Sequence, residues 1–178
     1  NLNRMGRRLA TDGPFDDEFD IPFTTVHTGT IQGGTALNIV PKDCSFEFEF
    51  RHLPAHDPRA LLAEAVAFAR EELEPAMHAV NRDTGFRFEE RSSFPGLATD
   101  EAAEVTTLCK AATGANGTSK VAFGTEAGLF EAAGIPTIVC GPGNIDQAHK
   151  PDEFIALEQV ALCEEFLSRV LDSVARRA

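Results

Sequence analysis

Four short segments of the chain combine residue types that bind or orient small molecules. The first is the run Gln32 to Pro41, which contains two adjacent glycines and Asn38. Glycine pairs permit positive φ and a close backbone approach to a ligand, while an asparagine amide offers both donors and an acceptor. The alternative is a glycine-containing connection between two strands, with Asn38 in a left-handed turn position. Spacing alone favours this structural interpretation.

Two further segments could recognise an anionic group. Arg51 ends an alternating segment, and a guanidinium on an open sheet face can clamp a carboxylate in bidentate fashion. A cross-strand pair with a neighbouring glutamate is an equally good interpretation. The turn Gly124 to Gly128 (Gly-Thr-Glu-Ala-Gly) lies where a strand should give way to a helix, whose free N–H groups suit anions. Thr125 as a plain N-cap is the simpler interpretation, and the two are compatible.

The fourth segment carries the one histidine that is placed like a metal ligand. A Gly-Pro-Gly turn follows an apolar run and leads to His149, at the end of a strand where α/β sites usually lie. Neutral imidazole is a common metal ligand, and Glu153 could orient the ring, although a lone loop histidine usually has no such role. A catalytic zinc needs three protein ligands and a two-metal site needs more. We therefore expect that the chain cannot complete a metal site by itself.

Composition narrows the class of protein. The chain has 178 residues, 43% of them hydrophobic, and a formal net charge of −12. Nucleic acids and anionic membranes both require a basic face, so neither is an expected partner. No apolar run is long enough to span a bilayer. The four cysteines lie far apart in apolar runs, which predicts buried free thiols and a reducing, cytoplasmic setting: Cys44, Cys109, Cys140 and Cys163.

The first half of the chain predicts an α+β sandwich, with helices on one face of an antiparallel sheet. Residues 44–51 alternate phenylalanine with polar residues, which is typical of a strand with one covered face. A strand is also expected over Phe23 to Ile31 and a third at Phe86 to Phe88. Helices are expected over residues 1–11 and from Asp57 to Pro75, with the proline ending the second. A first strand is expected upstream of Asn1.

The second half predicts alternating helices and strands, hence a parallel or mixed sheet. Two subdomains should meet near residue 93, where the pattern changes. The expected elements are a helix at 100–112, a strand at Lys120 to Phe123, a helix at 126–133, a strand at Ile135 to Cys140 and an amphipathic helix at 156–175.

Taken together, the four segments resemble the M20 family of di-metal peptidases and deacylases. The Gly-Gly-Thr-Ala-Leu-Asn-Ile-Val-Pro run, Arg51 thirteen residues after Asn38, the Gly-Thr-Glu-Ala-Gly turn and the Ala-His-Lys-Pro-Asp-Glu ending occur in family order over nearly the whole chain. The resemblance implies that residues 1–92 form a lid, or dimerisation, domain. Residues 93–178 would then be the C-terminal α/β part of a di-zinc catalytic domain.

The resemblance also implies a role for each matched residue. His149 matches a metal ligand from the catalytic domain. Asn38 and Arg51 match lid residues that reach the substrate, in some members across a dimer interface. Gly124 and Thr125 match the loop that holds the substrate's carboxylate or acyl end. Glu126 is a candidate for binding a basic side chain of the substrate, an inference from its charge.

The activity implied by the resemblance is amide hydrolysis of a small N-acyl amino acid. The family uses two zinc ions, with cobalt possible, and we expect a homodimer formed through the lid domain. The other metal ligands and the general base would belong upstream of Asn1, so we expect a C-terminal portion that is inactive alone. The alternatives are another family member, such as a desuccinylase or carboxypeptidase, or a non-catalytic dimerisation module with a translation start close to residue 1.

Overall fold

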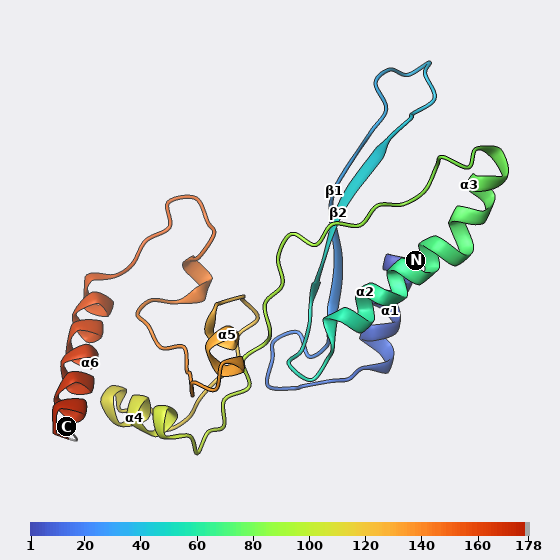
Figure 1. The fold of residues 1–178 in the computed structure, drawn as a ribbon. Coiled ribbons are helices and arrows are strands. Elements are labelled where there is room, and N and C mark those ends of the chain that lie inside the picture. Colours follow the sequence, from blue (N-terminus) through green and yellow to red (C-terminus); the bar gives the residue numbers. More distant parts are fainter. Residues whose placement is uncertain (177–178) are drawn as a thin grey trace. The chain divides into compact units, whose positions relative to one another are not determined.

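The computed structural model describes residues 1–176 and divides into two compact units. The first, here called the hairpin unit, contains residues 1–96 together with 120–124. The second, the helical unit, contains residues 97–119 and those from 125 onward. Figure 1 shows the elements of each. The assignment of residues 1–92 to a lid domain and 93–178 to a catalytic domain stays a prediction.

The hairpin unit is built on one antiparallel pair of strands. β1 (Thr25–Gly33) and β2 (Cys44–Arg51) pair along their whole length, which confirms both predicted strands. Thr25 pairs with Arg51 at one end and Gly33 with Cys44 at the other. The register shifts between Thr28 and Thr30, as at a β-bulge. Arg51 and the loop 34–43 therefore lie at opposite ends of the hairpin (Figure 1).

Two helices pack on this sheet, as the alternating strand predicts. α1 (Leu2–Asp12) and α2 (Pro58–Phe68) contribute the buried cluster, against which side chains from both strands pack. The face is only partly covered, because Phe46, nearest the loop, remains 41% exposed. The cluster consists of Met5, Leu9, Leu61 and Ala65, with Leu2, Val26 and Phe50 packed against it.

The predicted end of the second helix at Pro75 is wrong. α2 continues through the π-helical turn η1 (Ala69–Leu73) into α3 (Glu74–Val80), and Figure 1 shows the three as one rod. Pro75 lies in the first turn of α3, where the missing N–H and fixed φ of proline are tolerated. Pro75 lies just after the change from η1 to α3, and the helical rod continues beyond it.

The predicted third strand at Phe86 to Phe88 is also wrong, since these residues have no strand partner. The N–H of Phe86 donates to the Glu74 carboxylate at 2.9 Å, so a side chain takes the hydrogen bond that a neighbouring strand would take. This bond, with Arg70 nearby, lowers the pKa of Glu74. The rings of Phe86 and Phe88 stack, with centroids 6.4 Å apart. The segment is thus anchored to α3 by a buried carboxylate, 8% exposed.

The helical unit contains the three predicted helices and, among its described residues, no strand. Strands were expected at Lys120 to Phe123 and Ile135 to Cys140, and these expectations are wrong. A strand needs a neighbour to complete its hydrogen bonds, and no described segment pairs with either. The α/β part of the predicted fold is therefore not shown. The helices are α4 (Glu104–Thr113), α5 (Ala127–Ala132) and α6 (Leu157–Ala175), with the short 3₁₀ turn η2 (Ile145–Gln147).

The structure also bears on membrane spans and on the cysteines. No helix within residues 1–176 is long and apolar enough to cross a membrane. The expectation of buried thiols is wrong, because Cys44 and Cys140 are exposed while Cys109 and Cys163 are half-buried. All four cysteines are free. Apolar neighbours in sequence therefore do not by themselves bury a cysteine.

Candidate functional site

Arg51 lies at the end of β2, where its guanidinium meets the segment 120–124 of the same unit. Its Nη1 donates to the carbonyl of Ala122 at 3.5 Å, and its Nε donates to the Glu49 carboxylate at 2.9 Å. The side chain remains 61% exposed. The pair with Glu49 agrees with the structural interpretation of Arg51, although it runs along one strand rather than across two. Ala122 lies two residues before Gly124, where the predicted substrate loop begins.

The turn itself is open at its first residue. A side-chain carbon added at Gly124 would meet no other atom within 4 Å, so the backbone there is accessible. The hydroxyl of Thr125 accepts the N–H of Ala127 at 3.2 Å, which is the plain capping role. Glu126 is exposed. Because α5 has only six residues, its dipole contributes little to anion binding. The groups of the turn that remain accessible are the Gly124 backbone and the Glu126 carboxylate.

Asn38 lies in the loop between β1 and β2, away from Arg51. It is exposed, and the left-handed conformation suggested for it is wrong, since His149 and Asp152 are the non-glycine residues with positive φ among residues 1–176. Gly34 takes the left-handed conformation instead, with φ of 78°. The glycine pair thus allows the chain to turn at the end of β1. Within one chain, the structure does not bring Asn38 and Arg51 together.

His149 is exposed in the helical unit, with φ of 59°. Its backbone N–H donates to the Glu153 carboxylate at 3.0 Å. Glu153 therefore holds the backbone of the loop rather than the imidazole ring, contrary to the expectation. Among residues 1–176, no three His, Cys, Asp or Glu side chains form a group that could hold a metal ion. His149 as a metal ligand stays a prediction, and these residues do not fit a complete metal site.

Sequence reasoning missed an ion-pair cluster beside Arg51. Lys120 Nζ lies 2.7 Å from a carboxylate oxygen of Asp16 and 2.7 Å from one of Glu18. The same nitrogen lies 5.5 Å from the ring centroid of Phe19. The two carboxylates raise the pKa of Lys120, while its hydrogen bond lowers the pKa of Asp16. Lysine and aspartate are 104 residues apart, and no spacing rule links them.

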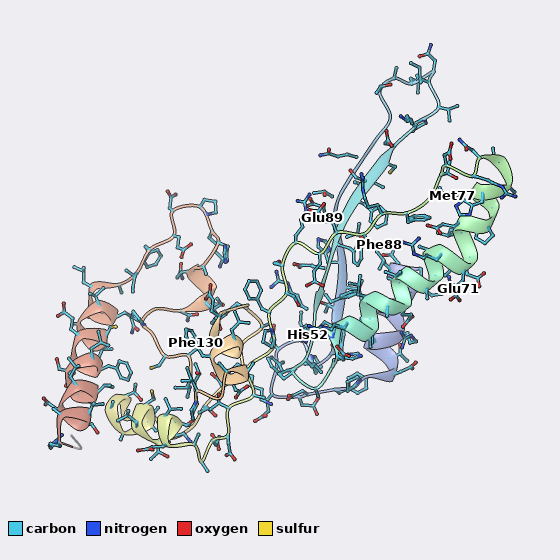
Figure 2. All side chains as sticks on the ribbon, viewed as in Figure 1. His52, Glu71, Met77, Phe88, Glu89 and Phe130 are labelled. Atoms are coloured by element: carbon cyan, nitrogen blue, oxygen red, sulfur yellow. The ribbon has the colours of Figure 1, made fainter. Side chains whose placement is uncertain are left out.

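His52 is a second residue near Arg51 that the motifs do not single out. It is half-buried after the end of β2, near the start of α2 (Figure 2). Its Nδ1 lies 3.1 Å from the carbonyl of Leu53, and its Nε2 lies 3.3 Å from the carbonyl of Phe94. The ring therefore joins the end of the sheet to the segment that leaves the unit.

Comparison with known proteins tests the resemblance to the M20 family. Residues 2–77 match the peptidase dimerisation domain of the M20 peptidases. The resemblance to the M20 family that the four motifs indicate is thereby confirmed, and the hairpin with its two packed helices is consistent with that domain.

Particular relatives agree with the finer resemblance, since the Gly-Thr-Glu-Ala-Gly turn and the His-Lys-Pro-Asp-Glu ending look most like acetylornithine deacetylase. An acetylornithine deacetylase of Myxococcus xanthus is 36% identical over 88% of the chain. An N-acetyl-L-citrulline deacetylase of Xanthomonas campestris pv. campestris is 33% identical over 81%, and an acetylornithine deacetylase of Klebsiella pneumoniae is 30% identical over 87%. The chain spans 38–40% of the length of these relatives.

Proposed function

We propose that this chain is part of a hydrolase of linear amides that converts N-acetyl-L-ornithine to ornithine and acetate, a step of arginine biosynthesis. The names of two of the relatives support this substrate. The observation that carries the proposal is the position of Arg51. Its exposed guanidinium donates to the carbonyl of Ala122, two residues before Gly124, and this supports a common role for Arg51 and Gly124.

In this proposal Arg51 and the backbone at Gly124, which belong to the same unit, hold the substrate's carboxylate. The Nη2 group of Arg51 makes no hydrogen bond with residues 1–176, so it remains a donor for an anion. Gly124 leaves its backbone open to the same ligand, and Thr125 follows it. Glu126, which is exposed, is proposed from its charge alone to bind the basic side chain of ornithine. These residues bind and orient the substrate, and none of them is a general base.

The proposal also includes a homodimer through the lid domain. Asn38 is exposed at the far end of the hairpin from Arg51, so it would contact the substrate bound by a second copy. The match of residues 2–77 to a dimerisation domain supports this arrangement. The loop and adjoining strand ends carry exposed apolar side chains suited to an interface: Ile31, Leu37, Ile39, Val40 and Phe46.

Zinc, as two ions with cobalt a possible substitute, belongs to the proposal through the family resemblance alone. His149 would supply one ligand, and the residues described here do not supply a complete set. When bound, the metal would activate water for attack on the amide. We infer that the chain by itself is inactive, and that the protein works in the cytoplasm, since all four cysteines are free thiols.

The test is hydrolysis of acetylornithine by the complete protein with added zinc or cobalt. The Arg51→Ala variant should lower kcat/KM by roughly 10- to 100-fold, because a charge-assisted hydrogen bond contributes about 1.5–3 kcal/mol. Arg87→Ala is the matched control, since Arg87 is exposed in the same unit and has no ion pair within residues 1–176. Hydrolysis of succinyl-diaminopimelate with none of acetylornithine would contradict the proposal in favour of a desuccinylase.

N-acetylcitrulline is a second candidate substrate, because a deacetylase of that compound is 33% identical. Ornithine carries a positive side chain and citrulline a neutral one, so Glu126 distinguishes them. Glu126→Gln should lower kcat/KM for acetylornithine by roughly tenfold and leave acetylcitrulline nearly unchanged. Equal losses of kcat/KM for both substrates would show that Glu126 does not recognise the substrate's side chain. Absence of any hydrolase activity from the complete protein would instead favour a non-catalytic dimerisation module.

A further inference from the structure

Lys120 begins a segment that leaves its sequence neighbours and joins the hairpin unit. Residues 120–124 belong to that unit, whereas residues 97–119 and those from 125 onward belong to the helical unit. Among the described residues, no backbone hydrogen bond of a helix or strand holds the segment there. Its attachment therefore depends on side chains, and two attachments are present.

The first attachment is the Lys120 side chain on the loop before β1. Asp16 and Glu18 each approach Nζ to 2.7 Å, and the ring of Phe19 lies 5.5 Å away. The loop is itself held in place, because Phe15 and Phe23 form a β-bridge and Asp16 N–H donates to the carbonyl of Pro22 at 2.8 Å. A single cation shared by two carboxylates and an aromatic face is a network rather than an isolated surface pair.

The second attachment is the bond from Arg51 to the carbonyl of Ala122 at 3.5 Å. Arg51 pairs with Thr25 in the sheet, and Thr25 directly follows the loop that carries Asp16 and Glu18. Both attachments therefore lie at the same end of the hairpin. Ala122 lies between Lys120 and Gly124, so a cation fixed at Lys120 limits where the Gly124 turn can begin.

We propose that Lys120 is a positioning residue, whose ion pairs with Asp16 and Glu18 hold the segment 120–124 so that the Gly124 turn starts beside Arg51. Its consequence for substrate binding rests on the proposed function. Arg51 alone makes one long contact with the segment, whereas Lys120 makes two short ones. Without Lys120, the backbone at Gly124 would lose its fixed distance from the guanidinium.

The anchoring itself is tested on this chain. Carbodiimide treatment should join Lys120 to Asp16 or Glu18, with the pair Lys110 and Glu101, 3.2 Å apart in the other unit, as the positive control for peptide mapping. NMR order parameters of the backbone at Val121 to Gly124 should be about 0.85 in the unchanged chain and below about 0.6 in Lys120→Ala. Lys120→Arg should restore the rigid values, and Lys110→Ala should not change them. Unchanged order parameters in Lys120→Ala would overturn the proposal.

The consequence for substrate is tested in the complete protein. Lys120→Ala should raise KM for the hydrolysed acyl amino acid by roughly two- to fivefold with kcat nearly unchanged, as expected for lost substrate binding. Lys120→Arg should recover the original KM, which a general loss of folding would not do. An unchanged KM in an active enzyme would overturn the positioning role alone. An inactive unchanged protein would refute the proposed function, while the order parameters would still decide the anchoring.

Discussion

The hairpin unit and the helical unit both contain amphipathic helices, but the apolar faces of these helices are covered to different extents. In the hairpin unit, α1 buries Met5 and Leu9 to 1% exposure against the sheet and α2. In the helical unit, α6 has no buried residue, and Leu157 and Leu171 are 85% and 69% exposed. An apolar stripe thus indicates a helix wherever it occurs. It stabilises the helix only where another surface covers it.

The largest difference between the units should appear on truncation of one leucine in each. Leu9→Ala removes a buried side chain and should lower the free energy of unfolding of the hairpin unit by about 2–5 kcal/mol. Leu171→Ala removes an exposed one and should change that of the helical unit by less than about 0.5 kcal/mol. Urea unfolding followed by NMR gives signals for each unit separately. Equal losses would mean that α6 is covered in solution, and the comparison would fail.

The same difference explains what the sequence could predict. All the predicted helices exist, because their signals are local: Asp57 caps α2, and Gly114 and Gly134 follow α4 and α5 in left-handed conformation. The hairpin strands are also local, since a short loop joins them. The predictions of strands at 86–88, 120–123 and 135–140 are wrong, because a strand depends on a partner elsewhere in the chain. The alternation of apolar and polar residues in a segment does not identify that partner.

The candidate site shows the same limit. Arg51, Gly124 and His149 are candidates because they stand in recognisable motifs, and their roles stay predictions. The contact of Arg51 with Ala122, and the cluster around Lys120, connect residues 71 and 104 positions apart and could not be read from spacing. Sequence motifs identified candidate ligand contacts, and the structure added the bond from Arg51 to Ala122 and the ion pairs of Lys120.

Helix caps give a second, smaller way to compare the units. Asp57 accepts the N–H of Arg59 at 2.9 Å, whereas α6 begins after Ala156, which is extended and has no side-chain cap. Asp57→Ala should destabilise the hairpin unit by about 1 kcal/mol, and Ala156→Ser should stabilise the helical unit by a similar amount. Asp57→Asn should retain most of the cap. Thermal unfolding by circular dichroism measures all three, and no gain from Ala156→Ser would show that the start of α6 already has another partner.

The smallest effect concerns pH and a buried hydroxyl in the hairpin unit. Thr24, 1% exposed, accepts the N–H of Leu53 at 3.1 Å and lies 2.9 Å from Nδ1 of His56. Burial, then the charges of His52 and Arg8, lower the pKa of His56. A neutral ring with its proton on Nε2 can accept the hydroxyl proton of Thr24 at Nδ1. A protonated ring would leave that buried proton without an acceptor.

The sign of the pH effect follows from this depressed pKa. The unfolded chain binds a proton at His56 more readily than the folded chain does, so the contribution is fully present above about pH 6.5 and is lost as pH falls through the folded pKa. The hairpin unit should therefore lose stability between pH 7.5 and 5.5, by less than the cap substitution costs. His56→Gln should reduce this slope, whereas His27→Gln, exposed in β1, should not. If His56→Gln left the slope unchanged, the network at Thr24 would not be the source of the pH dependence.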